Sequence, residues 1–161
     1  MCSNFYLMEV LKDFKKFVGV FPCNRIPTIQ IDNEGFKCMI INTNKYQDEG
    51  MGHWLLVTFF IVDNILTLCE IFDSLGGGGK GVPLHLSEYI SKLRIDVKYS
   101  TIRVQALTSD FCGIFCITRF LSILIGEKQI RFMKYFNLKL LERNDTKLVS
   151  LINGYLKKIN G

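Results

Sequence analysis

The stretch Asp110-Phe111-Cys112-Gly113-Ile114-Phe115-Cys116, which continues as ITRFLSILIG to residue 126, decides the fold of this 161-residue chain. Its apolar residues run almost without interruption from Cys112 to Ile125, and the clearly polar positions among them are Thr118, Arg119 and Ser122. A helix with so little polar surface is buried on most of its sides. Ser109 or Asp110 is the expected N-cap, and Gly126 stands just past the end. We therefore predict a central buried helix.

Four short runs rich in β-branched and aromatic residues predict strands of one sheet. They cover residues 37–42, 53–62, 66–72 and 101–105. Asp63-Asn64 lies between the second and third runs and suits a tight turn. Residues 53–72 are therefore predicted to form an antiparallel hairpin whose two chain ends lie side by side.

Further helices complete the predicted order. Apolar residues at helical spacing predict helices over residues 5–18, 86–93 and, after the capping candidates Asn144 and Asp145, 148–159. Helix, strands, central helix and further helices in this order are typical of an α+β fold. We expect a single domain over residues 1–161, in which a mixed, mostly antiparallel sheet packs against the central buried helix.

Composition argues against several classes of protein. Hydrophobic residues make up 48% and charged residues 22%, which is ordinary for a globular chain that folds without metals or disulfides. The longest apolar stretch, Trp54–Val62, is much shorter than the ~20 residues of a membrane-crossing helix, and the first residues lack an export pattern. We expect no membrane association, no secretion and no metal site. Most of the six cysteines are predicted to be buried, inert thiols.

Cys112 is the candidate nucleophile. A thiol attacks as thiolate, and a cysteine at a helix start lies at the positive end of the helix dipole among unpaired N–H groups, which favours ionisation. Gly113 follows directly and leaves room in the cleft for a substrate backbone. A Cys-Gly pair alone more often belongs to an ordinary buried thiol, so the assignment depends on the rest of the site.

His53 and Asp73 stand at the two ends of the predicted hairpin, which brings a base and its orienting carboxylate together. Trp54 is expected to pack beside the imidazole and to line the substrate cleft. A two-residue turn would place His53 and Asp73 on opposite faces, so we predict a three-residue turn or a β-bulge. Glu70 is the rival carboxylate, but it lies three residues inside its strand, on the order of 10 Å farther from the His53 end.

Gln105 precedes the nucleophile by seven residues, at the end of a predicted strand. Its amide N–H₂ and the Cys112 backbone N–H could together donate hydrogen bonds to an oxyanion, and a neutral amide does so without titrating. The alternative is a solvated glutamine at a strand end. The predicted catalytic set is therefore His53, Asp73, Gln105 and Cys112.

The ordered motifs are Gly52-His53-Trp54, Phe72-Asp73-Ser74-Leu75-Gly76, Gln105 and Asp110-Phe111-Cys112-Gly113. This order resembles the adenovirus-type maturation cysteine proteases, also carried by virophages and polinton-like elements, and the resemblance extends over residues 36–120. It implies a permuted papain-like cysteine protease fold with the active site between the central helix and the sheet. It also implies the four catalytic roles given above.

The resemblance implies a cysteine endopeptidase that processes viral capsid precursor proteins during virion maturation, in the virion and in the host cytoplasm or a viral factory. We expect a monomer that requires no cofactor and that DNA or an activating peptide can stimulate. A disulfide-linked peptide is doubtful, because residues 93–104 contain no cysteine. The SUMO- and ubiquitin-like-specific proteases share these motifs and are an alternative. A catalytically silent capsid- or DNA-associated domain is another.

Positive charge is concentrated in residues 128–161, which hold eight Lys and Arg against two acids. Lys128, Arg131 and Lys134 recur at three-residue spacing and are candidates to contact the phosphates of double-stranded DNA; a solvated basic surface is the alternative. Gly76–Gly79 predicts a loop near the orienting aspartate that moves over bound peptide. His85 is predicted to be a surface histidine in a loop.

Overall fold

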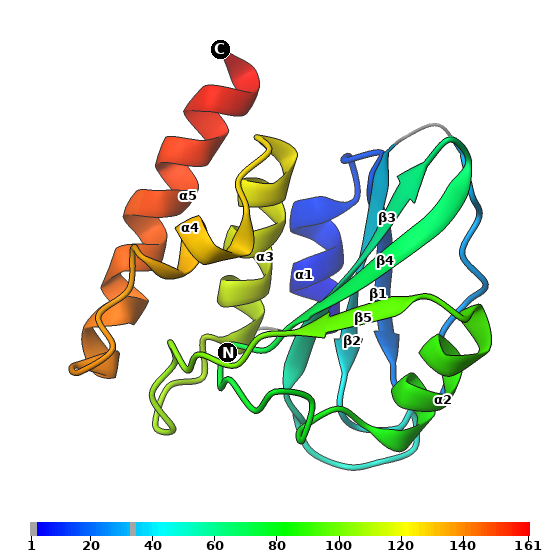
Figure 1. Cartoon of the computed structure of the whole chain (residues 1–161). Helices are drawn as coiled ribbons and strands as arrows, with labels where there is room; N and C mark the ends of the chain where they lie inside the picture. Colours follow the sequence, from blue (N-terminus) through cyan, green and yellow to red (C-terminus); the bar gives the residue numbers. More distant parts are fainter. Residues whose placement is uncertain (1–2, 33–34) are drawn as a thin grey trace.

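A computed structural model describes residues 3–32 and 35–161, in which one sheet is enclosed by helices (Figure 1). In spatial order the strands of the sheet are β1 (Phe17–Pro22), β2 (Phe36–Asn42), β3 (Trp54–Val62), β4 (Ile65–Phe72) and β5 (Asp96–Tyr99). The helices are α1 (Asn4–Leu11), α2 (Leu84–Leu93), α3 (Cys112–Leu124), α4 (Gln129–Met133) and α5 (Asn144–Asn160), with the 3₁₀ helix η1 (Leu141–Arg143) before α5. The chain is thus α+β, as predicted.

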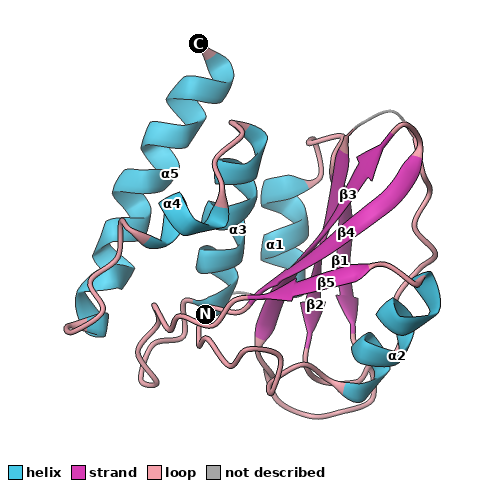
Figure 2. Cartoon of the chain, in the orientation of Figure 1, coloured by secondary structure: helices cyan, strands magenta, loops and turns pink. Residues whose placement is uncertain are grey.

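Both faces of the sheet are covered (Figure 2). Helices α1 and α3 pack on one face, where Leu56 and Phe72 join the core cluster that contains Phe115. Helix α2 covers the opposite face through Leu86 and Ile90. Because strands buried on both faces need apolar residues at successive positions, β3 has an almost continuous apolar sequence.

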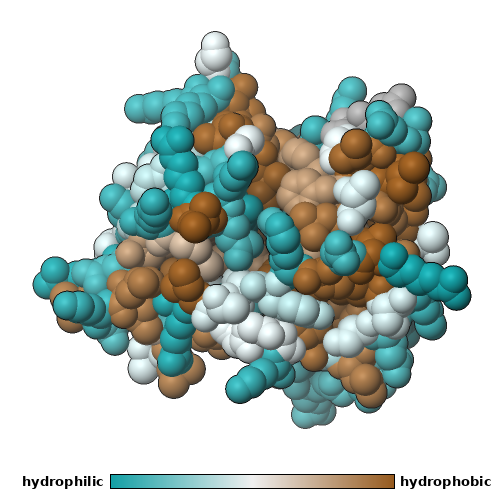
Figure 3. All heavy atoms as spheres, viewed as in Figure 1, coloured by the Kyte–Doolittle hydropathy of each residue, from teal (hydrophilic) through white to brown (hydrophobic). Residues whose placement is uncertain are grey.

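The central helix is confirmed. Eleven of the 13 residues of α3 are buried, including its polar residues Thr118, Arg119 and Ser122. Helix α5 lies on the side of α3 that faces away from the sheet (Figure 1). The space-filling view shows the same division, with apolar surface between the sheet and the helices and hydrophilic side chains over much of the outer helical surface (Figure 3).

The sheet is mixed, as predicted, and more of its paired residues are antiparallel than parallel. Among the described strands, β2 with β3 and β3 with β4 pair antiparallel, whereas β1 with β2 and β4 with β5 pair parallel. Each parallel pair includes an edge strand, β1 or β5. The chain between β1 and β2 covers residues 23–35, and the chain between β4 and β5 contains α2.

The hairpin of β3 and β4 contains the predicted bulge. Asp63 and Asn64 form a tight turn, with φ of 50° and 61°, and Val62 pairs with Ile65. The register then shifts, so that Ile61 pairs with Leu66 but Phe60 pairs with Leu68. The extra residue, Thr67, changes the parity of every later pair. A two-residue turn with a bulge, and not a three-residue turn, therefore places His53 and Asp73 on one face.

Two predicted elements are wrong in part. The helix predicted over residues 5–18 ends at Leu11, and residues 17–22 form β1, because Phe17 and residues 19–22 pair with β2, with a register shift at Val18. The strand predicted over residues 101–105 is irregular chain. The strand lies earlier, at Asp96–Tyr99, where the sequence pairs with β4.

The predicted N-cap of the central helix is also wrong. Phe111, and not Ser109 or Asp110, occupies the cap position, and its side chain makes no capping hydrogen bond. The Ser109 hydroxyl still contributes, since it accepts a hydrogen bond from the Phe111 N–H at 3.2 Å. Cys112 is consequently the first residue of α3.

The described cysteines are buried thiols, namely Cys23, Cys38, Cys69, Cys112 and Cys116. Burial raises the pKa of Cys38 and that of Cys69 to about 12, which makes both thiols inert at neutral pH. Over residues 3–32 and 35–161, no helix combines the length and apolarity that crossing a bilayer requires.

Candidate active site

Two neighbouring strand ends and the start of the central helix meet at one place. His53 directly precedes β3, Asp73 directly follows β4, and Cys112 begins α3. His53 Nε2 lies 2.7 Å from Asp73 Oδ1, and the imidazole and the Cys112 thiol are close enough to shift each other's pKa. The structure therefore brings together the predicted nucleophile, base and orienting carboxylate.

The main chain of His53 is fixed by Thr43, the residue after β2. Thr43 Oγ1 accepts a hydrogen bond from the His53 N–H at 2.9 Å, and the Thr43 N–H donates to the His53 carbonyl at 2.8 Å. Gly52 has a φ of +60°, and a Cβ at this position would overlap Asn42 Oδ1. The Asn42 side-chain amide in turn donates to the Met51 carbonyl at 2.8 Å. Glycine is therefore required directly before the histidine.

Asp73 is fixed by Ser100, the residue after β5. Ser100 Oγ accepts a hydrogen bond from the Asp73 N–H at 2.7 Å and donates to the Asp73 carbonyl at 3.0 Å. Asp73 Oδ1 also accepts from the Leu75 N–H at 2.8 Å. The glycine-rich loop lies beside the other oxygen, since a Cβ at Gly81 would be 3.3 Å from Oδ2. The predicted loop is in place, and its movement over a substrate stays a prediction.

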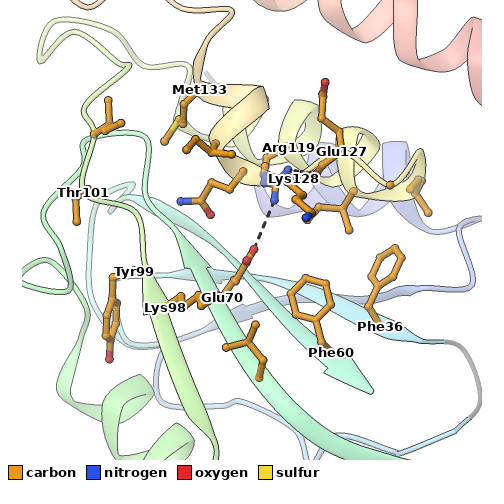
Figure 4. A pocket seen from close by; sticks show the side chains of 17 residues that line it. Phe36, Phe60, Glu70, Lys98, Tyr99, Thr101, Arg119, Glu127, Lys128 and Met133 are labelled. Atoms are coloured by element: carbon orange, nitrogen blue, oxygen red, sulfur yellow. Dashed lines mark hydrogen bonds and ion pairs between the residues drawn. The ribbon is translucent and has the colours of Figure 1, made fainter. Parts of the chain in front are cut away.

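Glu70, the rival carboxylate, belongs to a different region. Its Oε2 lies 3.5 Å from Arg119 Nη2, inside a cavity of about 920 Å³ between β4, β5, α3 and α4 (Figure 4). The lining of this cavity includes none of His53, Asp73 and Cys112. Asp73, and not Glu70, is the carboxylate that holds the imidazole.

The thiol and the imidazole alter each other's pKa. Burial lowers the pKa of His53, but hydrogen bonds to Asp73 and Cys112 and the negative charges of both outweigh it and raise the pKa to about 9. Burial raises the pKa of Cys112, but hydrogen bonds from His53 and from the backbone of Trp54 and Gly113 lower it below the usual value. Both shifts favour a thiolate–imidazolium pair near neutral pH.

Gln105 is buried, which is inconsistent with a solvated glutamine at a strand end. Its Oε1 accepts a hydrogen bond from the Ser74 hydroxyl, and its Nε2 donates to the Ser109 carbonyl at 2.7 Å. Ser74 directly follows Asp73, and Ser109 lies three residues before Cys112. The amide is thus held between two segments of the site.

Trp54 and Gly113, the predicted cleft residues, are both buried. Trp54 nevertheless borders a hollow of about 300 Å³ that is also lined by Met51 and by the start of α1. The exposed apolar side chains near the nucleophile in sequence are those of Leu107 and Phe111, which are 77% and 36% exposed. Gly113 contributes its backbone N–H to the thiolate.

The predicted phosphate contacts, Lys128, Arg131 and Lys134, are exposed on α4 and at its two ends. The Arg131 guanidinium lies 3.3 Å from the Glu127 carboxylate, which neutralises part of the positive charge. Binding of DNA here stays a prediction. His85 is exposed as predicted, but it lies in the first turn of α2 and not in a loop.

The sequence interpretation missed the hydroxyl groups that support the site. Thr43, Ser74 and Ser100 bond to His53, Gln105 and Asp73 respectively. Ser74 belongs to the motif around Asp73, whereas Thr43 and Ser100 lie outside the four functional motifs. Thr43 and Ser100 are ten and 27 residues from their partners. Such hydroxyl residues are common at strand ends, and a single sequence carries no signal that distinguishes these two.

No model of a known protein family matches the chain, and no curated protein matches it. Within the described residues, no group of three or more His, Cys, Asp and Glu side chains is placed to hold a metal ion.

The thiolate–imidazolium pair predicts unusual reactivity of Cys112. We expect iodoacetamide to alkylate Cys112 readily at pH 6, where a thiol of ordinary pKa is almost fully protonated. His53→Ala should slow that reaction at pH 6 by about tenfold or more, since each unit of thiol pKa changes the thiolate fraction about tenfold in this range. The rate is measured by peptide mass spectrometry, with His85→Ala as control. A Cys112 rate that rises only near pH 8–9, as for a free thiol, would contradict the pair.

Gly50 and Gly52 offer a matched pair of substitutions, since both have positive φ but a Cβ at Gly50 meets nothing within 4 Å. Gly50→Ala should cost only the strain of a left-handed alanine, about 1–2 kcal/mol. Gly52→Ala should cost more and should also slow Cys112 alkylation at pH 6, because Asn42 must move and His53 moves with the main chain. Chemical denaturation and the alkylation rate measure the two effects. Equal behaviour of the two variants would show that the contact with Asn42 is unimportant.

Proposed function

We propose that this protein is a cysteine endopeptidase in which Cys112 is the nucleophile, His53 the proton carrier, Asp73 the orienting carboxylate and Gln105 an oxyanion donor. The observation that carries the proposal is the hydrogen bond between imidazole and carboxylate beside the Cys112 thiol, with the cysteine pKa lowered and the histidine pKa raised. A histidine–carboxylate pair with a purely structural role would not require a neighbouring thiol whose pKa is lowered by the same imidazole.

The first half of the reaction forms an acyl-enzyme. The Cys112 thiolate attacks the carbonyl carbon of a peptide bond, and the carbonyl oxygen becomes an oxyanion that accepts hydrogen bonds from the Cys112 N–H and Gln105 Nε2. His53 Nε2 faces Asp73, so Nδ1 faces the sulfur and donates its proton to the leaving amine. The C–N bond breaks, and a thioester remains on Cys112.

The second half releases the acyl group. The neutral His53 accepts a proton from water as the water oxygen attacks the thioester carbon. The tetrahedral intermediate collapses, the carbon–sulfur bond breaks, and the thiolate–imidazolium pair forms again. Asp73 keeps the ring orientation and stabilises the imidazolium in both halves, which is why its main chain and its Oδ1 are both fixed.

We further propose that the fold is the permuted papain-like one and that the substrates are viral capsid precursors, cleaved in the virion or in a viral factory of the host cell. The order of the motifs in the sequence supports this, and a mixed sheet beside a buried helix that begins with the nucleophile is compatible with it. SUMO- and ubiquitin-like precursors are the alternative substrates, because the same motifs occur in their proteases.

Cleavage during co-expression tests the activity. The wild-type chain, Cys112→Ala and Cys112→Ser are each produced with candidate capsid precursors and with a SUMO fusion, and cleavage products are sequenced at their new N-termini. We expect wild-type protein alone to give products, and the substrate cut identifies the branch. Loss of activity in Cys112→Ala should be at least about 10³-fold, as for other nucleophile deletions. A wild type that cuts nothing, with Cys112 unreactive as well, would favour a silent binding domain.

The pH dependence separates the two roles of His53. Its raised pKa means that the imidazolium is present below about pH 9 and is lost as the pH rises through that value. Hydrolysis needs the imidazolium as proton donor, so kcat/KM should fall above about pH 9, whereas alkylation of Cys112 needs no proton donor and should not fall. Asp73→Asn removes the charge that raises the histidine pKa and should move the falling limb to lower pH. A limb unmoved by Asp73→Asn would assign the high pKa to another group.

A further inference from the structure

The segment that carries Gln105 has no regular secondary structure of its own. Residues 100–111, between β5 and α3, form neither helix nor strand. Within this segment, the Val104 and Gln105 N–H groups both donate to the carbonyl of Ser74, just after β4, at 2.9 and 3.0 Å. These bonds fix the main chain of Gln105, but they leave the remainder of the segment, up to Cys112, to be held by other contacts.

Ser109 connects that remainder to the site. Its carbonyl accepts the hydrogen bond from Gln105 Nε2, and its N–H donates to the Ala106 carbonyl at 3.1 Å. Its hydroxyl accepts from the Phe111 N–H and donates to Asp145 Oδ1 at 3.0 Å. Ser109 thus uses its N–H, carbonyl and hydroxyl to link the glutamine amide, the residue before the nucleophile and α5.

Helix α5 holds this segment with its first two residues. Asn144 is buried, and its Nδ2 donates to the Val104 carbonyl and to the Asn137 carbonyl, each at 2.8 Å. Its Oδ1 accepts from the Asn137 N–H at 2.8 Å, so the whole amide is used. Asp145 is the partner of Ser109. The two residues contact the segment on either side of Gln105, although they lie more than 30 residues after it.

We propose that Asp145 and Asn144 are positioning residues, which hold the Gln105 amide and the main chain before Cys112 at the geometry that an oxyanion requires. The inference rests on the proposed peptidase function. Asp145 acts on the side chain through Ser109, and Asn144 acts on the main chain through Val104. An oxyanion donor that moves by about 1 Å loses much of its effect. The contacts made by the first two residues of α5 therefore affect the catalytic rate.

Asp145→Ala, Asp145→Asn and Glu142→Ala test the proposal. Asp145→Ala should lower kcat by about tenfold to a hundredfold, with KM nearly unchanged, because the lost contact acts on the transition state. Asp145→Asn keeps an oxygen that accepts the Ser109 hydroxyl and should retain most of kcat. Glu142→Ala removes an exposed carboxylate just before α5 and should have no effect, which controls for lost charge at the helix start.

Two further readouts separate this role from general destabilisation. Alkylation of Cys112 at pH 6 needs no oxyanion donor and should be unchanged in Asp145→Ala. Hydrogen exchange of the Ser109 and Phe111 N–H groups should accelerate in Asp145→Ala but not in Glu142→Ala. Ser109→Ala should reduce kcat similarly, and the double variant Ser109→Ala/Asp145→Ala should be no worse than either single variant.

The outcomes are distinguishable. Wild-type kcat and wild-type exchange in Asp145→Ala would overturn the proposal, as would an equal loss of hydrolysis and of alkylation. If the wild-type chain hydrolyses nothing, the proposed peptidase function fails. The exchange data still decide whether Asp145 orders residues 106–111.

Discussion

The site depends on a charged pair that its own burial opposes. Burial raises the pKa of the Cys112 thiol and lowers the pKa of the His53 imidazole, so without further contacts both groups would be neutral. The hydrogen bonds reverse both effects. Asp73 stabilises the imidazolium, and the imidazolium and two backbone groups stabilise the thiolate. Because hydrogen bonds weaken steeply with distance and angle, the pair exists only while three elements of the fold keep their relative positions.

That requirement explains why the supporting contacts are made to the main chain. Thr43 bonds to both the N–H and the carbonyl of His53, and Ser100 does the same for Asp73. His53 and Asp73 lie just beyond the ends of β3 and β4, where the sheet no longer satisfies their backbone groups. Thr43 and Ser100, which directly follow the neighbouring strands β2 and β5, supply the hydrogen bonds that strand pairing does not. The main chain is thereby fixed, and the side-chain contact between imidazole and carboxylate can be short.

Elements that are determined by residues close together in the sequence could be predicted, whereas elements that depend on contacts between distant residues could not. The central helix and the hairpin were predictable because apolar pattern and turn chemistry determine them within a few residues. Phe17 and Val18 fit the end of a helical pattern as well as the start of a strand, and the pairing of Phe17 and residues 19–22 with β2 decides between them. Gln105 was predicted to lie at the end of a strand, and this prediction was wrong. No strand carries it; contacts with Ser74 and Ser109 do.

The bulge at Thr67 shows how core packing and the site are coupled. Leu55 and Val57 of β3 and Cys69 and Ile71 of β4 belong to the core beneath α2, and Leu56 and Phe72 belong to the core beneath α3. Because side chains alternate between the two faces along a strand, His53 and Asp73 continue the face of the first of these two groups. A bulge-free register would pair residues from opposite cores and would also turn Asp73 away from His53. The apolar pattern of β4 therefore requires the bulge, and the orientation of the carboxylate follows from the burial of its neighbours.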